Sequence, residues 1–275
     1  MNSKIVIIGS GRVATQLGKR LVEQGMPVAQ VLGRNIEHAS KLALALGADS
    51  YSDQWSGVLP DAGWIILAVS DDAINDVAAA LSPHVPEVLV THTSGATPGA
   101  VLKPFFKRYG VFYPLQSFSE EHTPDWSAVP FCVDASTETD LLFLEKKAER
   151  VGGKVYRVND EQRAVLHLGA VFANNFANHC FAVAHELLET QGLPFELLHP
   201  LMRATLDKAL AHPPAEVQTG PALRGDKDTI DRHIQLLEVH PLWQEMYRLM
   251  SEGIVTGFLN NSVTPELPPN NRSQP

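Results

Sequence analysis

A short glycine-rich segment near the N-terminus has the residue types that bind a phosphate group through the backbone. It reads Gly9-Ser10-Gly11-Arg12-Val13-Ala14 and fits the pattern G-x-G-x-x-A, between an apolar run and an amphipathic helical pattern. Gly9 permits a tight turn, Gly11 lets the backbone approach a pyrophosphate, and Ala14 keeps the helix close to the strand. The helix amides then face the anion. We therefore expect this loop to hold a dinucleotide; an ordinary strand-to-helix turn is the alternative.

The residues after the second expected strand indicate which dinucleotide it is. An NAD-preferring site usually has Asp or Glu here to bind the ribose hydroxyls, but this chain has Gly33-Arg34-Asn35. Arg34 could supply a planar cation for the 2′-phosphate of NADP, and Asn35 could add a hydrogen bond without repelling it. NADP is the expected cofactor, and a solvated surface arginine is the alternative.

Two further strand ends should line the same crevice, because ligands of such sheets bind outside the carboxyl ends of the strands. The first is Ala68-Val69-Ser70, which we expect to contact the cofactor. The second is Thr93-Ser94-Gly95, whose amides and hydroxyls suit a nicotinamide carboxamide or a substrate carboxylate. Ser94 could equally be the N-cap of the next helix.

A polar stripe interrupts an apolar helical pattern in the second half of the chain. His167, Asn174 and Asn178 are seven and four residues apart, so they share one face of an α-helix, with Asn175 on its flank. Their apolar surroundings predict partial burial, either in a crevice or in a helix-to-helix contact. Histidine, with an ordinary pKa of about 6.5, can donate a proton in a reduction, so His167 is the candidate acid.

Other polar residues contribute less specific signals. We expect the substrate to lie between Ser94, Gln116, His167 and Asn175. Arg224, in a turn before the helix-cap residue Asp226, is a candidate for a substrate carboxylate or a neighbouring subunit. His185 is followed by Glu189 where a zinc protease motif needs a second histidine, so no metal site is expected.

Residues 4–158 alternate short β-branched runs with helical periodicities, which predicts an α/β fold with a doubly wound parallel sheet. The expected strands are Lys4–Ile8, Val28–Leu32, Trp64–Val69, Val88–Thr91, Val111–Tyr113, Phe131–Asp134 and Lys154–Val158. Beyond residue 160 the pattern is helical only, and the expected helices are Glu161–Gln191, Phe195–Ala211, Asp226–Val239 and Pro241–Leu259. The predicted domains are therefore 1–159 and 160–261, with a disordered tail over 262–275.

Composition narrows the class of protein. The chain has 275 residues and a net charge of -9, which disfavours nucleic acid as the main partner. No apolar run reaches the roughly 18 to 20 residues that cross a bilayer, so we expect no membrane span and a cytoplasmic protein. The two cysteines, Cys132 and Cys180, are expected to be buried free thiols.

The order of these motifs resembles known families. The N-terminal half, including Leu67-Ala68-Val69-Ser70-Asp71-Asp72-Ala73-Ile74, is similar to the NADP-binding domain of pyrroline-5-carboxylate reductases and deazaflavin-dependent NADP reductases. The whole chain resembles a bacterial family that joins this Rossmann-like domain to a helical domain of unknown function. The carrying motifs are His92-Thr93-Ser94-Gly95, Tyr113-Pro114-Leu115-Gln116-Ser117-Phe118, the helix from His167 through Asn175, and Thr219-Gly220-Pro221 with Arg224-Gly225-Asp226.

The resemblance implies a helical domain related to the C-terminal domain of 6-phosphogluconate dehydrogenase, which often forms dimers. In such dehydrogenases a catalytic lysine stands on the first interdomain helix, with an asparagine one turn later. Here His167 stands near that place and Asn175 is two turns away.

Together the motifs predict an NADP-dependent oxidoreductase that reduces a small carbonyl or imine substrate in a cleft between the two domains. The expected oligomer is a homodimer through the helical domain. The alternative is a non-catalytic NADP-binding sensor or regulatory dimer.

Overall fold

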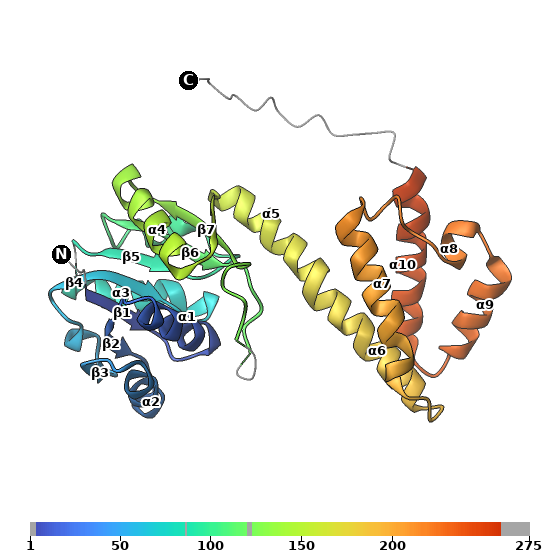
Figure 1. The fold of residues 1–275 in the computed structure, drawn as a ribbon, viewed down its shortest axis with the longest axis horizontal. Helices are drawn as coiled ribbons and strands as arrows, with labels where there is room; N and C mark the ends of the chain where they lie inside the picture. Colours follow the sequence, from blue (N-terminus) through green and yellow to red (C-terminus); the bar gives the residue numbers. More distant parts are fainter. Residues whose placement is uncertain (1–3, 86, 120–122, 260–275) are drawn as a thin grey trace, which may run out of the picture. The chain divides into compact units, whose positions relative to one another are not determined.

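The computed structural model describes residues 4–85, 87–119 and 123–259, which form two compact units (Figure 1). The first unit comprises residues 1–174 and the second residues 175–275. The tail expected over 262–275 lies outside the described residues.

The first unit contains an eight-stranded sheet in the order β3-β2-β1-β4-β5-β6-β7-β8. Neighbouring strands are parallel except β6 and β7. The strands are β1 (Lys4–Ile8), β2 (Val28–Leu32), β3 (Ser50–Ser52), β4 (Ala62–Leu67), β5 (Leu89–His92), β6 (Tyr109–Pro114), β7 (Pro130–Ala135) and β8 (Lys154–Arg157). The first six follow the Rossmann order, so the predicted doubly wound α/β fold is confirmed.

One strand was missing from the sequence prediction. β3 is only three residues long, pairs with β2 at the edge of the sheet, and contains Ser50, Tyr51 and Ser52. Its tyrosine is half exposed. An edge strand without an apolar face has no alternation of apolar and polar residues, so no sequence signal marks it.

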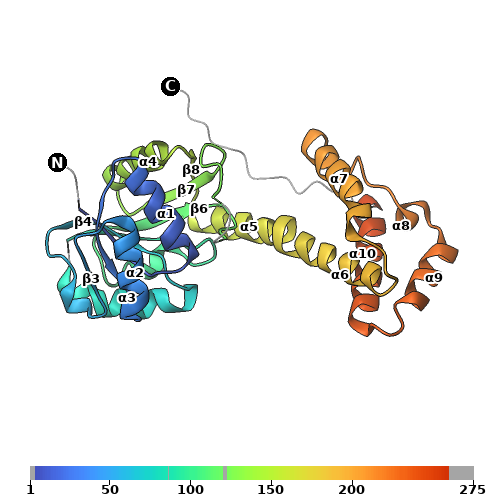
Figure 2. The ribbon, with the colours of Figure 1, turned by 60° about the horizontal axis from the view of Figure 1, so that its bottom comes forward.

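Helices cover both faces of the sheet (Figures 1 and 2). They are α1 (Arg12–Glu23), α2 (Ile36–Leu46), α3 (Ile74–Leu81) and α4 (Glu138–Val151), with 3₁₀ turns at Trp55–Gly57, Asp71–Ala73, Ser82–His84 and Gly99–Leu102. Alternate side chains of one strand enter opposite cores, because successive strand residues point to opposite faces. Ile5 and Ile7 pack with α1, α2 and α4, whereas Val6 and Ile8 pack with α3.

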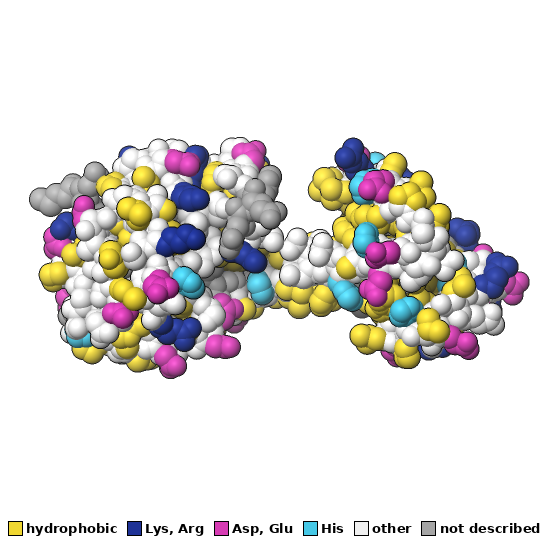
Figure 3. Space-filling view, turned by 90° about the horizontal axis from the view of Figure 1, so that it is seen from below, with side chains coloured by type: hydrophobic (Ala, Val, Ile, Leu, Met, Phe, Trp, Pro, Cys, Tyr) yellow, Lys and Arg dark blue, Asp and Glu magenta, His cyan; other side chains and the backbone are white. Residues whose placement is uncertain are grey.

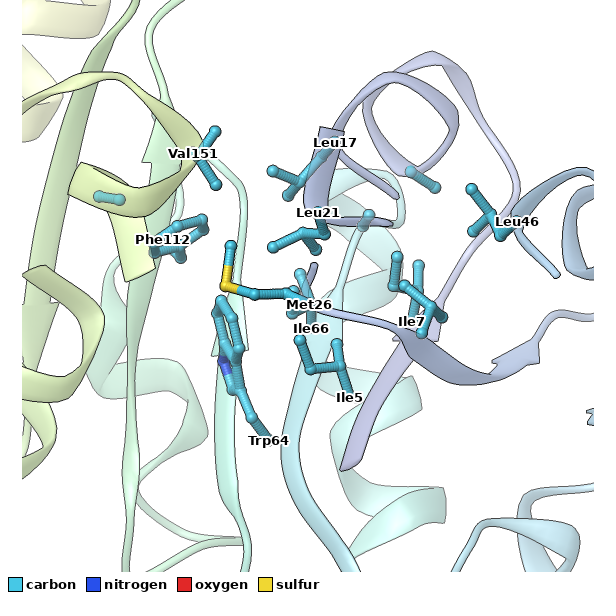
Figure 4. Close-up of a cluster of buried hydrophobic side chains, with 14 of the residues drawn as sticks. Ile5, Ile7, Leu17, Leu21, Met26, Leu46, Trp64, Ile66, Phe112 and Val151 are labelled. Atoms are coloured by element: carbon cyan, nitrogen blue, oxygen red, sulfur yellow. The ribbon is translucent and has the colours of Figure 1, made fainter. Parts of the chain in front are cut away.

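The core under α1 and α4 contains a fully buried tryptophan, Trp64 (Figure 4). Trp64 has no exposed surface, and its ring lies edge-on to Phe112 with centroids 5.0 Å apart. Its indole Nε1 donates to Thr91 Oγ1 over 2.9 Å, which satisfies the one polar atom of the ring. This packing fixes β4, β5 and β6 relative to one another, and the candidate site lies at their ends.

The helix expected over 161–191 is interrupted by a π turn. The chain forms α5 (Asp160–Ala170), a π-helical turn (Val171–Phe176) and α6 (Ala177–Glu189). A π turn is wider than an α turn, so residues beyond it no longer keep the α-helical spacing from His167. Asn174, Asn175 and Asn178 are exposed in the single chain, so one copy alone does not bury the polar stripe as expected.

The second unit is helical and has a 3₁₀ turn at Phe195–Leu198. Its helices beyond α6 are α7 (His199–Ala211), α8 (Pro221–Arg224), α9 (Lys227–Leu236) and α10 (Pro241–Leu259). Asp226 caps α9, as predicted, by accepting from the Thr229 amide over 3.1 Å. An all-α C-terminal region is thereby confirmed.

Few side chains of the second unit are buried. Among its described residues, Ala222 and Leu237 are the buried apolar ones. Large apolar side chains are instead exposed, and Figure 3 shows hydrophobic side chains spread over one face of the helical unit. They include Phe181, Leu193, Leu197, Leu201, Leu206, Leu210, Leu236, Leu242 and Leu249. This unit therefore has little core of its own.

The two cysteines differ in how deeply they are buried. Cys132 is a buried free thiol, as expected. Cys180 is also a free thiol but is only partly buried, like α6 as a whole, which has no buried residue. Within the described residues, no helix is long and apolar enough to cross a membrane.

Candidate functional site

The glycine loop lies where the strand order of the sheet reverses. β1 pairs with β2 on one side and with β4 on the other, so loops after β1 and β4 diverge and leave a crevice. Gly9 has φ +116°, and a Cβ there would stand 2.2 Å from the Ala68 carbonyl oxygen. Only glycine fits this position. The close approach brings two predicted cofactor segments, Gly9–Val13 and Ala68–Ser70, to one place.

The start of α1 is open to a ligand. Gly11 is the N-cap and supplies no side-chain hydrogen bond, and the first turn contains no acidic residue. A Cβ at Gly11 would meet no atom within 4 Å, and Arg12 beside it is exposed. The first amides of a helix lack internal partners and carry partial positive charge. This cradle fits the pyrophosphate of a dinucleotide.

The loop after β2 has the arrangement expected for NADP rather than NAD. Arg34 and Asn35 are exposed, and the Gly33 amide donates to the Ser52 carbonyl over 3.1 Å. Asn35 caps α2, with Oδ1 accepting from the His38 amide over 3.0 Å. None of the ion pairs between described residues includes Arg34. A phosphate can therefore bind Arg34 without first breaking an ion pair.

A groove between α1 and α2 adds cations that sequence reasoning missed. A cavity of about 590 Å³ is lined by Ser10, Gly11, Arg12, Thr15, Gln16, Lys19, His38, Lys41, Leu42, Ala45 and Ser119. It runs from the glycine loop along both helices, and four of its lining residues are basic or histidine. In the sequence these residues are typical of solvated helix faces, so only the pairing of α1 with α2 reveals the groove.

At the end of β5, polar side chains hold the turn that follows. Ser94 Oγ accepts from the amides of Ala96 and Thr97 over 3.2 and 2.9 Å, and the Ser94 amide donates to His92 Nδ1 over 3.2 Å. The capping role that was the alternative for Ser94 is thus present, although no α-helix follows. His92 and Ser94 are buried, and Thr93 is 9% exposed.

His92 is held neutral at this turn. Burial lowers its pKa to about 4, and the positive charge of Arg163 acts in the same direction. Because Nδ1 accepts a hydrogen bond, the neutral ring carries its proton on Nε2. His92 is therefore a structural group of the turn rather than an acid at neutral pH.

His167 meets the same turn from α5. Its Nδ1 lies 3.4 Å from the hydroxyl of Tyr113, near the end of β6. A Cβ on Gly95 would stand 2.6 Å from His167 Nδ1 and 2.8 Å from the Tyr113 hydroxyl. Two predicted site residues, Gly95 and His167, are thus brought together. Tyr113 was missed as a site residue because an aromatic side chain in a strand is typical of a core.

Two charged residues fasten α5 to this turn. Asp160 accepts from the amides of Gly99 and Ala100 over 2.8 and 3.4 Å, and Arg163 donates to Asp160 and to the Thr97 carbonyl, both over 2.7 Å. Burial opposes ionisation of Asp160, but the Gly99 amide and the Arg163 guanidinium outweigh it and lower its pKa. These contacts of Asp160 and Arg163 hold the first turn of α5, and His167 follows one turn after Arg163.

Of the other residues predicted to bind the substrate, Gln116 belongs to the first unit, and Asn175 and Arg224 belong to the second. Gln116 is exposed after β6, and its Oε1 accepts from the Ser117 amide over 2.8 Å. Asn175 and Arg224 are exposed residues of the second unit. Within the described residues, no group of three or more His, Cys, Asp or Glu side chains could hold a metal ion.

Two family models match the chain. Residues 4–95 match the family described as NADP oxidoreductase coenzyme F420-dependent, and residues 129–254 match a domain of unknown function, DUF2520. A search of curated proteins found no match.

Solved structures are similar over almost the whole chain. A Bacteroides fragilis protein provisionally named an NADP oxidoreductase is 37% identical, with a TM-score of 0.86, covering 92% of this chain and 98% of its own. An imine reductase of Myxococcus stipitatus in complex with NADP⁺ is 16% identical, with a TM-score of 0.66 and coverage of 94% and 100%.

A pyrroline-5-carboxylate reductase of Coxiella burnetii is 18% identical, with a TM-score of 0.58 and coverage of 96% and 100%. At identities below 20%, this enzyme and the imine reductase show a shared fold. The match to the Bacteroides fragilis protein spans both units at 37% identity. The chain therefore belongs to the family of NADP-dependent oxidoreductases in which a Rossmann-like domain precedes a DUF2520 domain.

Proposed function

We propose that the protein is a reductase that uses NADPH to reduce a small carbonyl or imine substrate. The observation that carries this proposal is the contact of His167 with Gly95 at the end of β5. A proton donor stands there in the same unit as the glycine loop, at the edge of the sheet where cofactors bind.

The residues assigned to the cofactor follow the strand ends. Gly9, Ser10, Gly11, Arg12 and Val13 would bind the pyrophosphate together with Ala68, Val69 and Ser70. Arg34 and Asn35, with Gly33 before them, would bind the 2′-phosphate, and Thr93 would face the nicotinamide. When it is bound, the cofactor supplies a hydride. Binding of the cofactor, orientation of the substrate and transfer of the proton are carried out by residues of the chain.

His167 supplies the proton in this proposal. As the substrate carbon receives the hydride, the oxygen or nitrogen of the C=O or C=N bond takes the proton from a ring nitrogen of His167. Gly95 lies beside it, and Ser94 and Gly95 would orient the substrate. Gln116, Asn175 and Arg224 are the further groups assigned to the substrate, with Arg224 suited to a carboxylate.

The names of related structures favour the C=N class. An imine and a pyrroline both contain a C=N bond, and the imine reductase and the pyrroline-5-carboxylate reductase are named for these compounds. Imines therefore come first in a substrate panel, with carbonyl compounds second.

The second unit would assemble with a second copy of the chain. Its exposed leucines and phenylalanines leave it almost without a buried core, and an isolated helical unit of this kind would lose the main term that stabilises folding. If the helical unit needs a partner to cover this surface in order to fold, that partner must be present whenever the chain is present. A second copy meets that condition, and C₂ dimers are the commonest assembly.

The test is NADPH consumption over a panel of cyclic imines, ketones and keto acids. We expect turnover of at least one imine or carbonyl compound, and a loss of about 10²-fold or more in kcat for His167→Ala. His84→Ala, at an exposed position of the same unit, serves as the control. Tight NADPH binding without turnover across the panel favours the sensor instead, whereas full turnover by His167→Ala removes only the assigned acid.

A further inference from the structure

One side chain of the crevice has no role in the proposed reaction, although it contacts the assigned acid. Tyr113 and His167 come from β6 and α5, and their rings meet nearly edge-on at 66° with centroids 6.3 Å apart. The phenol oxygen of Tyr113 lies 3.4 Å from Nδ1 of His167. Both side chains are partly buried.

The backbone below the pair is shaped to admit it. Gly95 lies under both rings, and its missing Cβ would stand 2.6 Å from Nδ1 and 2.7 Å from Cζ of Tyr113. Any larger residue would force the two rings away from the turn after β5. The contact between the two rings thus depends on three segments: β6, α5 and the turn after β5 that contains Gly95.

Tyr113 keeps its proton at neutral pH. Burial raises its pKa to about 12; Cys132 and Asp71 add to the increase, and Arg163 opposes it. A protonated phenol can donate to Nδ1 of a neutral imidazole and, after rotation of its hydroxyl, accept from Nδ1–H of an imidazolium. A carboxylate could do only the second. A tyrosine therefore suits a histidine that passes between both forms.

We propose that Tyr113 is a positioning residue, whose hydroxyl holds Nδ1 of His167 so that Nε2 carries the proton toward the substrate. The consequence for catalysis rests on the proposed function, but the pairing itself does not. In the reaction the Nε2–H bond of the imidazolium breaks and an O–H or N–H bond forms on the substrate. The ring is first left neutral with its proton on Nδ1, donating to Tyr113. Exchange with solvent then protonates Nε2 and removes the Nδ1 proton, which restores the resting tautomer that accepts from Tyr113. A further solvent proton forms the imidazolium again before the next turnover.

The test is ¹⁵N NMR of the histidine rings in the full-length protein without substrate or cofactor. His167→Gln identifies the His167 signals by their loss. We expect neutral His167 to carry its proton on Nε2, and its Nδ1 signal to show an accepted hydrogen bond. Tyr113→Phe should move that Nδ1 signal to the position of a ring without this bond. Tyr109→Phe, on the same strand, should leave it unchanged.

An Nδ1 signal that is the same in Tyr113→Phe as in the unchanged protein would overturn the proposal. So would a neutral ring with its proton mainly on Nδ1, and this second result needs no variant, so it decides the matter even if Tyr113→Phe does not fold. Because neither readout uses NADPH, failure of the pairing and failure of the proposed function are separate results. With an imine substrate, Tyr113→Phe should lower kcat about tenfold and leave KM unchanged.

Discussion

In the first unit, side chains such as Ile7 and Ile65 are buried on both faces of the sheet, with helices over each. In the second unit, leucines of comparable size, such as Leu206 and Leu210, are 59% and 78% exposed. A site for hydride transfer needs atoms held in place, and a packed sheet supplies that rigidity. We therefore propose that the first unit carries the chemistry and the second unit the assembly.

Removing a buried leucine from the first unit should lower the stability of that unit, and this is the largest effect that we expect. Leu17, on the buried face of α1, is fully buried, so Leu17→Ala should lower the free energy of unfolding by about 3 kcal/mol. Urea denaturation at several protein concentrations measures this loss, which should not vary with concentration. A loss below about 1 kcal/mol would mean that the first unit is not packed as described.

Acid should weaken the first unit through His92. Its pKa is about 4 in the folded protein and about 6.5 when unfolded, so between these values only the unfolded chain binds the proton. The contribution of His92 is fully present above pH 6.5 and is lost as the pH falls to 4, by about 3 kcal/mol in all. Urea denaturation at a series of pH values should show a flatter profile for His92→Gln.

The control for this pH effect is His84→Gln, at an exposed position of the same unit. It should leave the profile unchanged. If His92→Gln and His84→Gln give the same pH dependence as the unchanged protein, His92 is not the buried neutral group described here.

The glycine loop depends on the packed sheet beneath it. Gly9→Ala places a methyl group 2.2 Å from the Ala68 carbonyl at a φ of +116°, so the loop must move. We expect a loss of roughly 10²-fold in NADPH affinity, about 2.7 kcal/mol, by fluorescence titration. Gly47→Ala, which also has positive φ but lies after α2, is the control and should keep its affinity.

A charge on the helical surface should separate protomers without unfolding the first unit. Leu210→Asp introduces a carboxylate into the exposed apolar surface, and we expect at least tenfold weaker self-association in sedimentation experiments. Leu44→Asp is the matched control, because Leu44 is 85% exposed on α2 of the first unit. Equal effects of the two substitutions, or a monomeric unchanged protein, would contradict the assignment of the second unit to assembly.

The sequence predicted the fold well where a local pattern determines the structure. The apolar runs of β1 and β4 and the glycines between β1 and α1 carry their own signals, since burial on both faces demands β-branched residues. β3 was missed because its residues show no alternation of apolar and polar side chains, and the π turn was missed because a single wide turn has too few residues to mark it in the sequence. Tyr113 and the cations Lys19 and Lys41 were missed for another reason: their neighbours are distant in the chain, and only the folded sheet and the pairing of α1 with α2 bring them together.

We propose that the first unit binds NADP(H) through the glycine loop and Arg34. Calorimetric titration of the full-length protein with NADPH and NADH, repeated for Arg34→Asp, tests it most directly. We expect NADPH to bind at least tenfold more tightly than NADH, and Arg34→Asp to remove this preference. Failure to bind NADPH, or a preference that survives Arg34→Asp, would contradict it.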